Sequence, residues 1–123
     1  LKYIKEAIKL SDRPIESLYK QALAIEDSLK DIKIELYGDP IKSSLDMDQK
    51  QSPATRLGII GFEQKYSTAQ PTQTHRDSYA IAKSQITAIK QKMEQLSKVQ
   101  MKQLEEQLIQ AGAPYTPGRG LKE

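Results

Sequence analysis

The feature that most constrains the fold is an unbroken apolar seam in the first third of the chain. The seam consists of Ile15, Leu18, Ala22, Ile25, Leu29, Ile32 and Leu36. Their alternating steps of three and four place them on one stripe of an α-helix, which needs neighbouring helices to bury it. The stripe predicts a helix over residues 14–37. Pro14 suits its first turn, and Gly38 with Pro40 ends it.

A shorter pattern precedes this seam. Leu1, Ile4 and Ile8 repeat with helical spacing and predict a helix over residues 1–10. The two patterns share a heptad phase, so a single helix kinked at Pro14 is an alternative to a hairpin. We favour the hairpin because the segment LSDRP is typical of a loop. Since the chain starts inside a helical pattern without Met, we interpret it as a fragment of a longer protein, with the first helix truncated.

The middle of the chain predicts a polar linker followed by a short helix. Residues 38–52 are polar and longer than a typical helix–helix loop. Ser52 and Pro53 are a good N-cap and first residue for a helix over residues 53–66. Two glycines of this helix, Gly58 and Gly61, weaken it, so we expect them to allow the close approach of another helix backbone.

A long helix is predicted over residues 75–111. Thr74 with Asp77 reads as a capping box at its start. Its stripe runs through Tyr79, Ala82, Ile86, Ile89, Met93 and Leu96, then Met101, Leu104 and Leu108. The step from Leu96 to Met101 departs from the heptad and predicts a local shift of the seam. Gly112 is the expected C-cap, and an extended Pro/Gly-rich tail follows over residues 112–123.

These patterns predict an all-α fold, an antiparallel four-helix bundle formed by a single domain over residues 1–123. The composition agrees, because 37% of the 123 residues are hydrophobic and 28% are charged, as in a strongly solvated bundle with narrow apolar stripes. The core must be largely aliphatic, since the chain has no Trp and only one Phe. It also has no Cys, which excludes disulfides and thiol chemistry.

Little in the sequence indicates chemistry. The only histidine, His75, lies at a predicted helix start, where a solvent-exposed residue is the favoured interpretation. Adjacent carboxylates such as Glu105 and Glu106 do not face each other across a cleft, as glycosidase chemistry requires. We therefore expect no catalytic, cofactor-binding or metal site, no cofactor, and no enzyme activity in this fragment.

The charge pattern bears on partners. The net charge is +3, from 19 basic and 16 acidic residues whose signs are interleaved. A nucleic-acid surface more often clusters its cations, so we expect no nucleic-acid partner. No run approaches the roughly 20 apolar residues of a membrane span. The residues favoured for protein contacts are Tyr37, Tyr66 and Tyr115, which end or follow helices, and Arg119 in the tail.

Three segments together resemble one known family. They are IELYGD, STAQPTQTHRDSYAIA and LIQAGAPYTPGRG, and the most specific positions are Pro71, Thr72, Gln73, Thr74, Arg76 and Tyr79, with residues 111–119. Their order and spacing resemble the C-terminal helical region of bacterial sortilin-like proteins, which are β-propeller proteins with BNR (Asp-box) repeats described as glycosyl hydrolases. The resemblance covers most of the chain, but departs from the family at Tyr115 and in the linker.

The resemblance implies a place in a larger protein rather than an activity. The chain contains no Asp-box, and its arginines are scattered, so no catalytic residue carries over. The implied function is a non-catalytic accessory domain that packs on the upstream β-propeller of the same polypeptide or mediates assembly, with a homo-oligomer as a further possibility. The implied location is secreted or periplasmic. The alternative is a free-standing helical adaptor that binds an acidic partner or nucleic acid, suggested by the lysines of helix 75–111.

Overall fold

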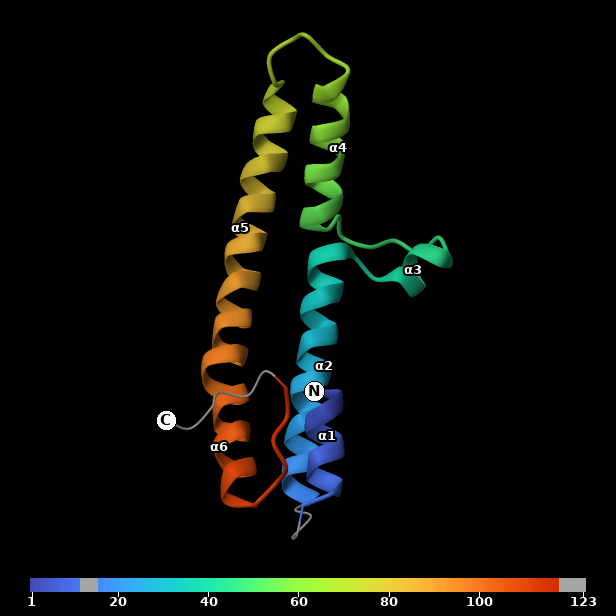
Figure 1. The fold of residues 1–123 in the computed structure, drawn as a ribbon. Helices are drawn as coiled ribbons and strands as arrows, with labels where there is room; N and C mark the ends of the chain where they lie inside the picture. Colours follow the sequence, from blue (N-terminus) through green and yellow to red (C-terminus); the bar gives the residue numbers. More distant parts are fainter. Residues whose placement is uncertain (12–15, 118–123) are drawn as a thin grey trace. The chain divides into compact units, whose positions relative to one another are not determined.

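The computed structural model describes residues 1–11 and 16–117, and within them the chain is all-α, without strands. In chain order the helices are α1 (Lys2–Lys9), α2 (Glu16–Tyr37), α3 (Pro40–Ser44), α4 (Pro53–Lys65), α5 (Gln73–Gln95), η1 (Leu96–Met101) and α6 (Lys102–Gln110) (Figure 1). The last three follow one another without a break, so the predicted long C-terminal helix is confirmed. The expected helix start at Pro14 and the tail residue Arg119 lie outside the described residues.

Contacts divide the chain into two compact units. Unit 1 comprises Leu1–Leu29 with Glu94–Glu123, and unit 2 comprises Lys30–Met93. Two helices contribute residues to both units, because α2 and α5 each extend past a unit boundary.

Unit 1 contains a closed apolar core. Its buried side chains are Ile4, Ala7 and Ile8 of α1, Leu18, Ala22 and Ile25 of α2, and Leu96, Leu104 and Leu108 of the C-terminal helix. Lys5 Nζ lies 2.8 Å from Glu26 Oε2. In one continuous helix these residues would be about 31 Å apart along the axis. The ion pair therefore confirms that α1 folds back on α2 as a hairpin.

The predicted seam shift is a turn of π-helix. The segment η1 covers Leu96–Met101. Its first and last residues are the two stripe positions whose spacing of five breaks the heptad. A π-turn closes i→i+5 hydrogen bonds and takes up one extra residue. In a regular α-helix Leu96 and Leu104 would lie about 80° apart around the axis. The π-turn lets both side chains be buried, at 5% and 0% exposure.

The end of α6 shows why the chain stops being helical at Gly112. This residue has a φ of 68°, in the left-handed region that glycine tolerates. Its N–H donates to Ile109 O at 3.2 Å, and Ala113 N–H donates to Leu108 O at 3.0 Å. This pair of hydrogen bonds is the Schellman motif. The tail then turns back from the end of α6 (Figure 1), and Thr116 is buried, with 4% of its surface exposed.

Unit 2 contains the end of α2, α3, α4 and most of α5. α4 and α5 form an antiparallel hairpin, joined by the turn at residues 66–72 (Figure 1). An ion pair between Glu35 and Lys92 ties α2 to α5. The buried apolar side chains are few here: Ile32, Ala82 and Ile89, with Pro53 at the start of α4. Unit 2 therefore has a much thinner core than unit 1.

The expected polar linker over residues 38–52 contains a helix. Asp39 caps α3, because its Oδ1 accepts hydrogen bonds from Ile41 N at 2.9 Å and Lys42 N at 3.3 Å. Pro40, which was expected only to block α2, occupies the first turn of α3. Asp followed by Pro is a helix-start signal. The segment predicted as a polar linker thus includes a short helix at residues 40–44.

The N-terminal caps of α4 and α5 differ in how well the sequence predicts them. Ser52 caps α4 as expected, since its Oγ accepts from Thr55 N at 3.2 Å. The cap of α5 is Thr72, whose Oγ1 accepts from His75 N at 3.2 Å. The expected capping box of Thr74 and Asp77 is therefore placed two residues too late. Asp77 Oδ1 instead accepts from Gln73 Nε2 at 2.8 Å, within the first turn.

Candidate functional site

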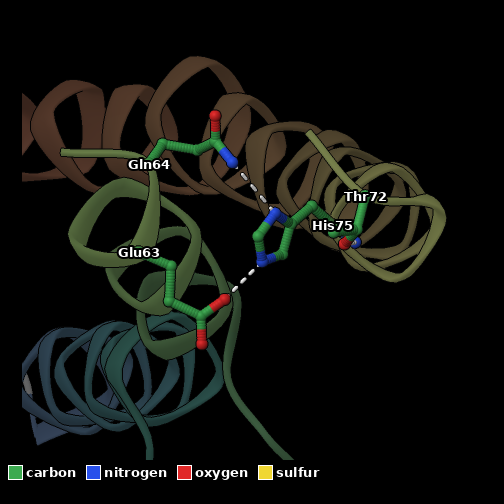
Figure 2. A network of polar contacts seen from close by, with 4 residues as sticks. All are labelled: Glu63, Gln64, Thr72 and His75. Carbon is green, nitrogen blue, oxygen red and sulfur yellow. Dashed lines mark hydrogen bonds and ion pairs between the residues drawn. The ribbon is translucent and has the colours of Figure 1, made fainter. Parts of the chain in front are cut away.

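His75 is the centre of a polar network at the closed end of the α4–α5 hairpin (Figure 2). Gln64 Nε2 lies 3.2 Å from Nδ1 of the imidazole, and an oxygen of the Glu63 carboxylate contacts Nε2. An amide N–H can only donate, so Nδ1 accepts and Nε2–H donates to Glu63. Only 14% of the His75 side chain is exposed. The expectation of a solvent-exposed histidine was wrong.

The network fixes the position of the histidine. Both imidazole nitrogens are engaged by side chains from the end of α4, and Thr72 holds the backbone of the same residue. The arrangement therefore acts as a clamp between α4 and α5.

One face of α4 is open and apolar. An added Cβ at Gly58 or Gly61 would meet no atom within 4 Å, so the close helix expected at these glycines is not among the described residues. Phe62 and Tyr66 lie beside them, with 67% and 71% of their surfaces exposed. Ile59 is 42% exposed. We call Gly58, Ile59, Gly61, Phe62 and Tyr66 the outer face of α4.

The two aromatic rings of this face are arranged together. The ring centroids of Phe62 and Tyr66 are 5.1 Å apart with an interplanar angle of 61°, an edge-to-face pair. Lys65 Nζ lies 5.5 Å from the centroid of the Tyr66 ring, within cation–π range. Solvent-exposed aromatic pairs beside glycines are typical of contact surfaces, because the glycines let an opposing surface come close.

The other predicted contact residues lie elsewhere. Tyr37 ends α2 and is 63% exposed, and Tyr115 of the tail is 61% exposed. Tyr115 belongs to unit 1, whereas Tyr37 and Tyr66 belong to unit 2. Tyr37 lines a groove in unit 2 that also contains Ile41 and Lys33.

The described residues contain neither a cluster suited to a metal ion nor a helix suited to crossing a membrane. Across residues 1–11 and 16–117, no group of three or more His, Cys, Asp or Glu side chains could hold a metal ion. None of the helices in the same part of the chain combines the length and apolar composition that crossing a membrane requires.

Comparisons with known proteins do not identify a family: no family model matches the sequence, and no curated protein or solved structure matches it.

Sequence reasoning missed two features of unit 2. The sequence pattern favoured a solvent-exposed His75, but Glu63 and Gln64 contact it from across the turn, on the preceding helix. The turn of residues 66–72 is short enough that the last turn of α4 and the first turn of α5 must be neighbours, and this was the available signal. The groove beside Tyr37 had no comparable signal, because it depends on where α3 lies.

Proposed function

We propose that this chain is a non-catalytic accessory domain of a BNR-repeat β-propeller protein of the glycosyl-hydrolase-like class, and that it packs on the propeller. The sequence resemblance motivates the identity of the partner. The observation that carries the docking role is the outer face of α4, where large apolar side chains are exposed beside two glycines that meet no other atoms. Such a face is costly to leave in water and is typical of an interaction site.

The proposed contact uses Phe62 and Tyr66 as anchors. Large aromatic side chains contribute most of the energy of many interfaces when a partner buries them. Gly58 and Gly61 let the partner backbone approach the helix axis, which brings the anchors into its pockets. The antiparallel four-helix bundle predicted from the sequence, and assembly into a homo-oligomer, remain parts of this proposal, because each would cover further apolar surface of unit 2.

The first test is the sequence encoded upstream of this chain. The proposal expects repeated Asp-boxes in a β-rich region of propeller length. An upstream region without them would contradict the propeller partner, while leaving the docking face itself to be tested with whatever domain is found there.

The second test uses the full-length protein and a matched pair of substitutions. Gly58→Leu adds a side chain in the centre of the proposed contact, and Ser84→Leu adds the same side chain at an exposed position of α5. We expect Gly58→Leu to raise the rate of limited proteolysis of α4 by about tenfold, because it would weaken the contact by about 1.4 kcal/mol. Ser84→Leu should leave the proteolysis rate unchanged. Equal proteolysis of both variants and the unmodified protein would contradict docking through α4.

The alternative of an adaptor for acidic partners or nucleic acid rested on the lysines of the C-terminal helix. Two of these have carboxylate partners: Lys92 pairs with Glu35, and Lys98 lies 3.8 Å from Glu94. The lysines of the C-terminal helix therefore present less net positive charge than the sequence suggests, and we do not propose them as a binding surface.

A further inference from the structure

A groove in unit 2 combines an apolar wall with positive charge. It lies between the end of α2, α3 and the segment that leads into α4, and its volume is about 910 Å³. Ile34, Tyr37 and Ile41 line it, and they are 41%, 63% and 68% exposed. Lys30, Lys33 and Lys50 line it as well. Three large apolar residues and three lysines thus line the same open space.

The charge of the groove is unbalanced. Among its described lining residues, Asp39 is the one acidic side chain. Its carboxylate is engaged, because Oδ1 accepts the N–H groups of Ile41 and Lys42 at the start of α3. Against Lys33 and Lys50, the one carboxylate leaves a net positive charge beside the apolar wall, and such a charge favours anionic groups.

The groove has a fixed backbone frame. Gly38 adopts a φ of 91°, which turns the chain from α2 toward α3. Gln49 Oε1 then accepts a hydrogen bond from Asp39 N at 3.0 Å and holds the far side of the groove against this turn. Ser52 fixes the start of α4 by accepting from Thr55 N. Hydrogen bonds from the backbone to the Gln49 and Ser52 side chains thus hold the edges of the groove.

We infer that this groove binds an acidic peptide segment of a partner protein, in which aliphatic or aromatic residues alternate with Asp or Glu. The apolar residues of the segment contact Ile34, Tyr37 and Ile41, and its carboxylates lie near Lys33 and Lys50. Charge complementarity selects the partner and speeds its association, while burial of the apolar wall supplies affinity. Nucleic acid fits less well, because single strands are held by a series of stacked aromatic rings and the groove offers one.

This inference does not rest on the proposed propeller function. The groove and the outer face of α4 share no lining residue. The groove could be occupied whether or not an upstream propeller exists, so failure of one proposal leaves the other standing.

The test begins with a random twelve-residue peptide library displayed on phage and selected on the complete chain at about 50 mM salt, where charge attraction is weakly screened. We expect the enriched peptides to carry both acidic and large apolar residues. The most enriched peptide is then synthesised with a fluorescent label and titrated by anisotropy against the chain and its variants, all checked for helicity by circular dichroism.

The variants come in matched pairs. Lys33→Glu and Lys50→Glu should each weaken binding by about tenfold or more, whereas the same charge reversal outside the groove, Lys83→Glu, should change it less than about twofold. Tyr37→Ala should weaken binding by about fivefold or more, and Tyr79→Ala, an exposed tyrosine on α5, should not. Raising salt to about 300 mM should weaken binding of the unmodified chain.

Three results would overturn the inference. One is enrichment of peptides without acidic residues. Another is equal weakening by Lys33→Glu and Lys83→Glu, which would show a response to net charge only. The third is a labelled single-stranded oligonucleotide that binds more tightly than the selected peptide and loses affinity in Lys33→Glu, which would assign the groove to nucleic acid.

Discussion

The two units use the same kind of helix in opposite ways. Unit 1 buries apolar side chains from α1, α2 and the C-terminal helix, and Leu104 and Leu108 are fully enclosed. In unit 2 most large apolar side chains are exposed: Ile34, Tyr37, Ile41, Leu45, Met47, Ile59, Phe62, Tyr66, Tyr79, Ile81, Ile86 and Met93. One unit has a complete core, and the other presents apolar surface to solvent.

The contrast is clearest along the long C-terminal helix. The stripe predicted from the sequence is continuous, yet in α5 only Ala82 and Ile89 of the stripe are buried, while Ile86 is 36% exposed. After η1, the stripe residues Leu104 and Leu108 are fully buried. An apolar stripe therefore shows that a helix has a face to bury, but not whether the chain itself supplies enough neighbours to bury it.

The largest effect should come from changing the length of the π-turn in unit 1. Inserting one Ala after Val99 places Leu96 and Leu104 nine residues apart, on opposite sides of a helix. We expect it to cost more than about 3 kcal/mol of unfolding free energy, as loss of a buried leucine does. Deleting Val99 gives a spacing of seven and a regular α-helix, so it should cost less than about 1 kcal/mol. Urea unfolding followed by circular dichroism measures both. Equal losses would contradict the role assigned to η1.

Truncating an apolar side chain of the C-terminal helix should cost more unfolding free energy in unit 1 than in unit 2. Leu104→Ala leaves a cavity in a closed core and should cost about 3 kcal/mol in urea unfolding. Ile86→Ala removes a half-exposed side chain of the same stripe and should cost less than about 1 kcal/mol. If the Ile86 substitution proved as costly as that of Leu104, unit 2 would have a closed core in solution and the contrast would be wrong.

Replacing a glycine by alanine should lower the stability of unit 1 and raise that of unit 2. Gly112→Ala forces a side chain into the left-handed conformation of the Schellman cap and should destabilise unit 1 by about 1 kcal/mol. Gly58→Ala meets open space in a regular helix and should stabilise α4 by up to about 1 kcal/mol. Thermal melts of the isolated chain compare them. A loss of stability on Gly58→Ala would show that another part of the chain already packs against this face.

The smallest effect concerns the cap of α5. Thr72→Ala removes the oxygen that accepts from His75 N and should cost about 1 kcal/mol. Thr74→Ala, inside the first turn, should cost less than about 0.5 kcal/mol. Chemical unfolding of both variants distinguishes the cap that the structure shows from the one that the sequence pattern favoured. A larger cost for Thr74→Ala than for Thr72→Ala would return the cap to Thr74.

The sequence predicts what is periodic or locally coded. The seams of α2 and of the C-terminal helix, the cap at Ser52 and the discontinuity after Leu96 all follow from spacing or from residue types with one strong conformational preference. Three features were missed or misplaced: α3, the cap at Thr72 and the partner of His75. Each involves polar residues that several local conformations satisfy equally well. The groove and the outer face of α4 depend on which neighbours a helix lacks, which no local pattern encodes.

Amide hydrogen exchange of the isolated chain tests the central contrast most directly, because exchange reports the free energy of opening at each amide. The account predicts that interior amides of α4 exchange through local opening, at least about tenfold faster than those of α6 after correction for intrinsic rates. It also predicts that α6 exchanges with the global unfolding of unit 1. Equal protection of α4 and α6 would contradict the view that unit 2 is open while unit 1 has a closed core.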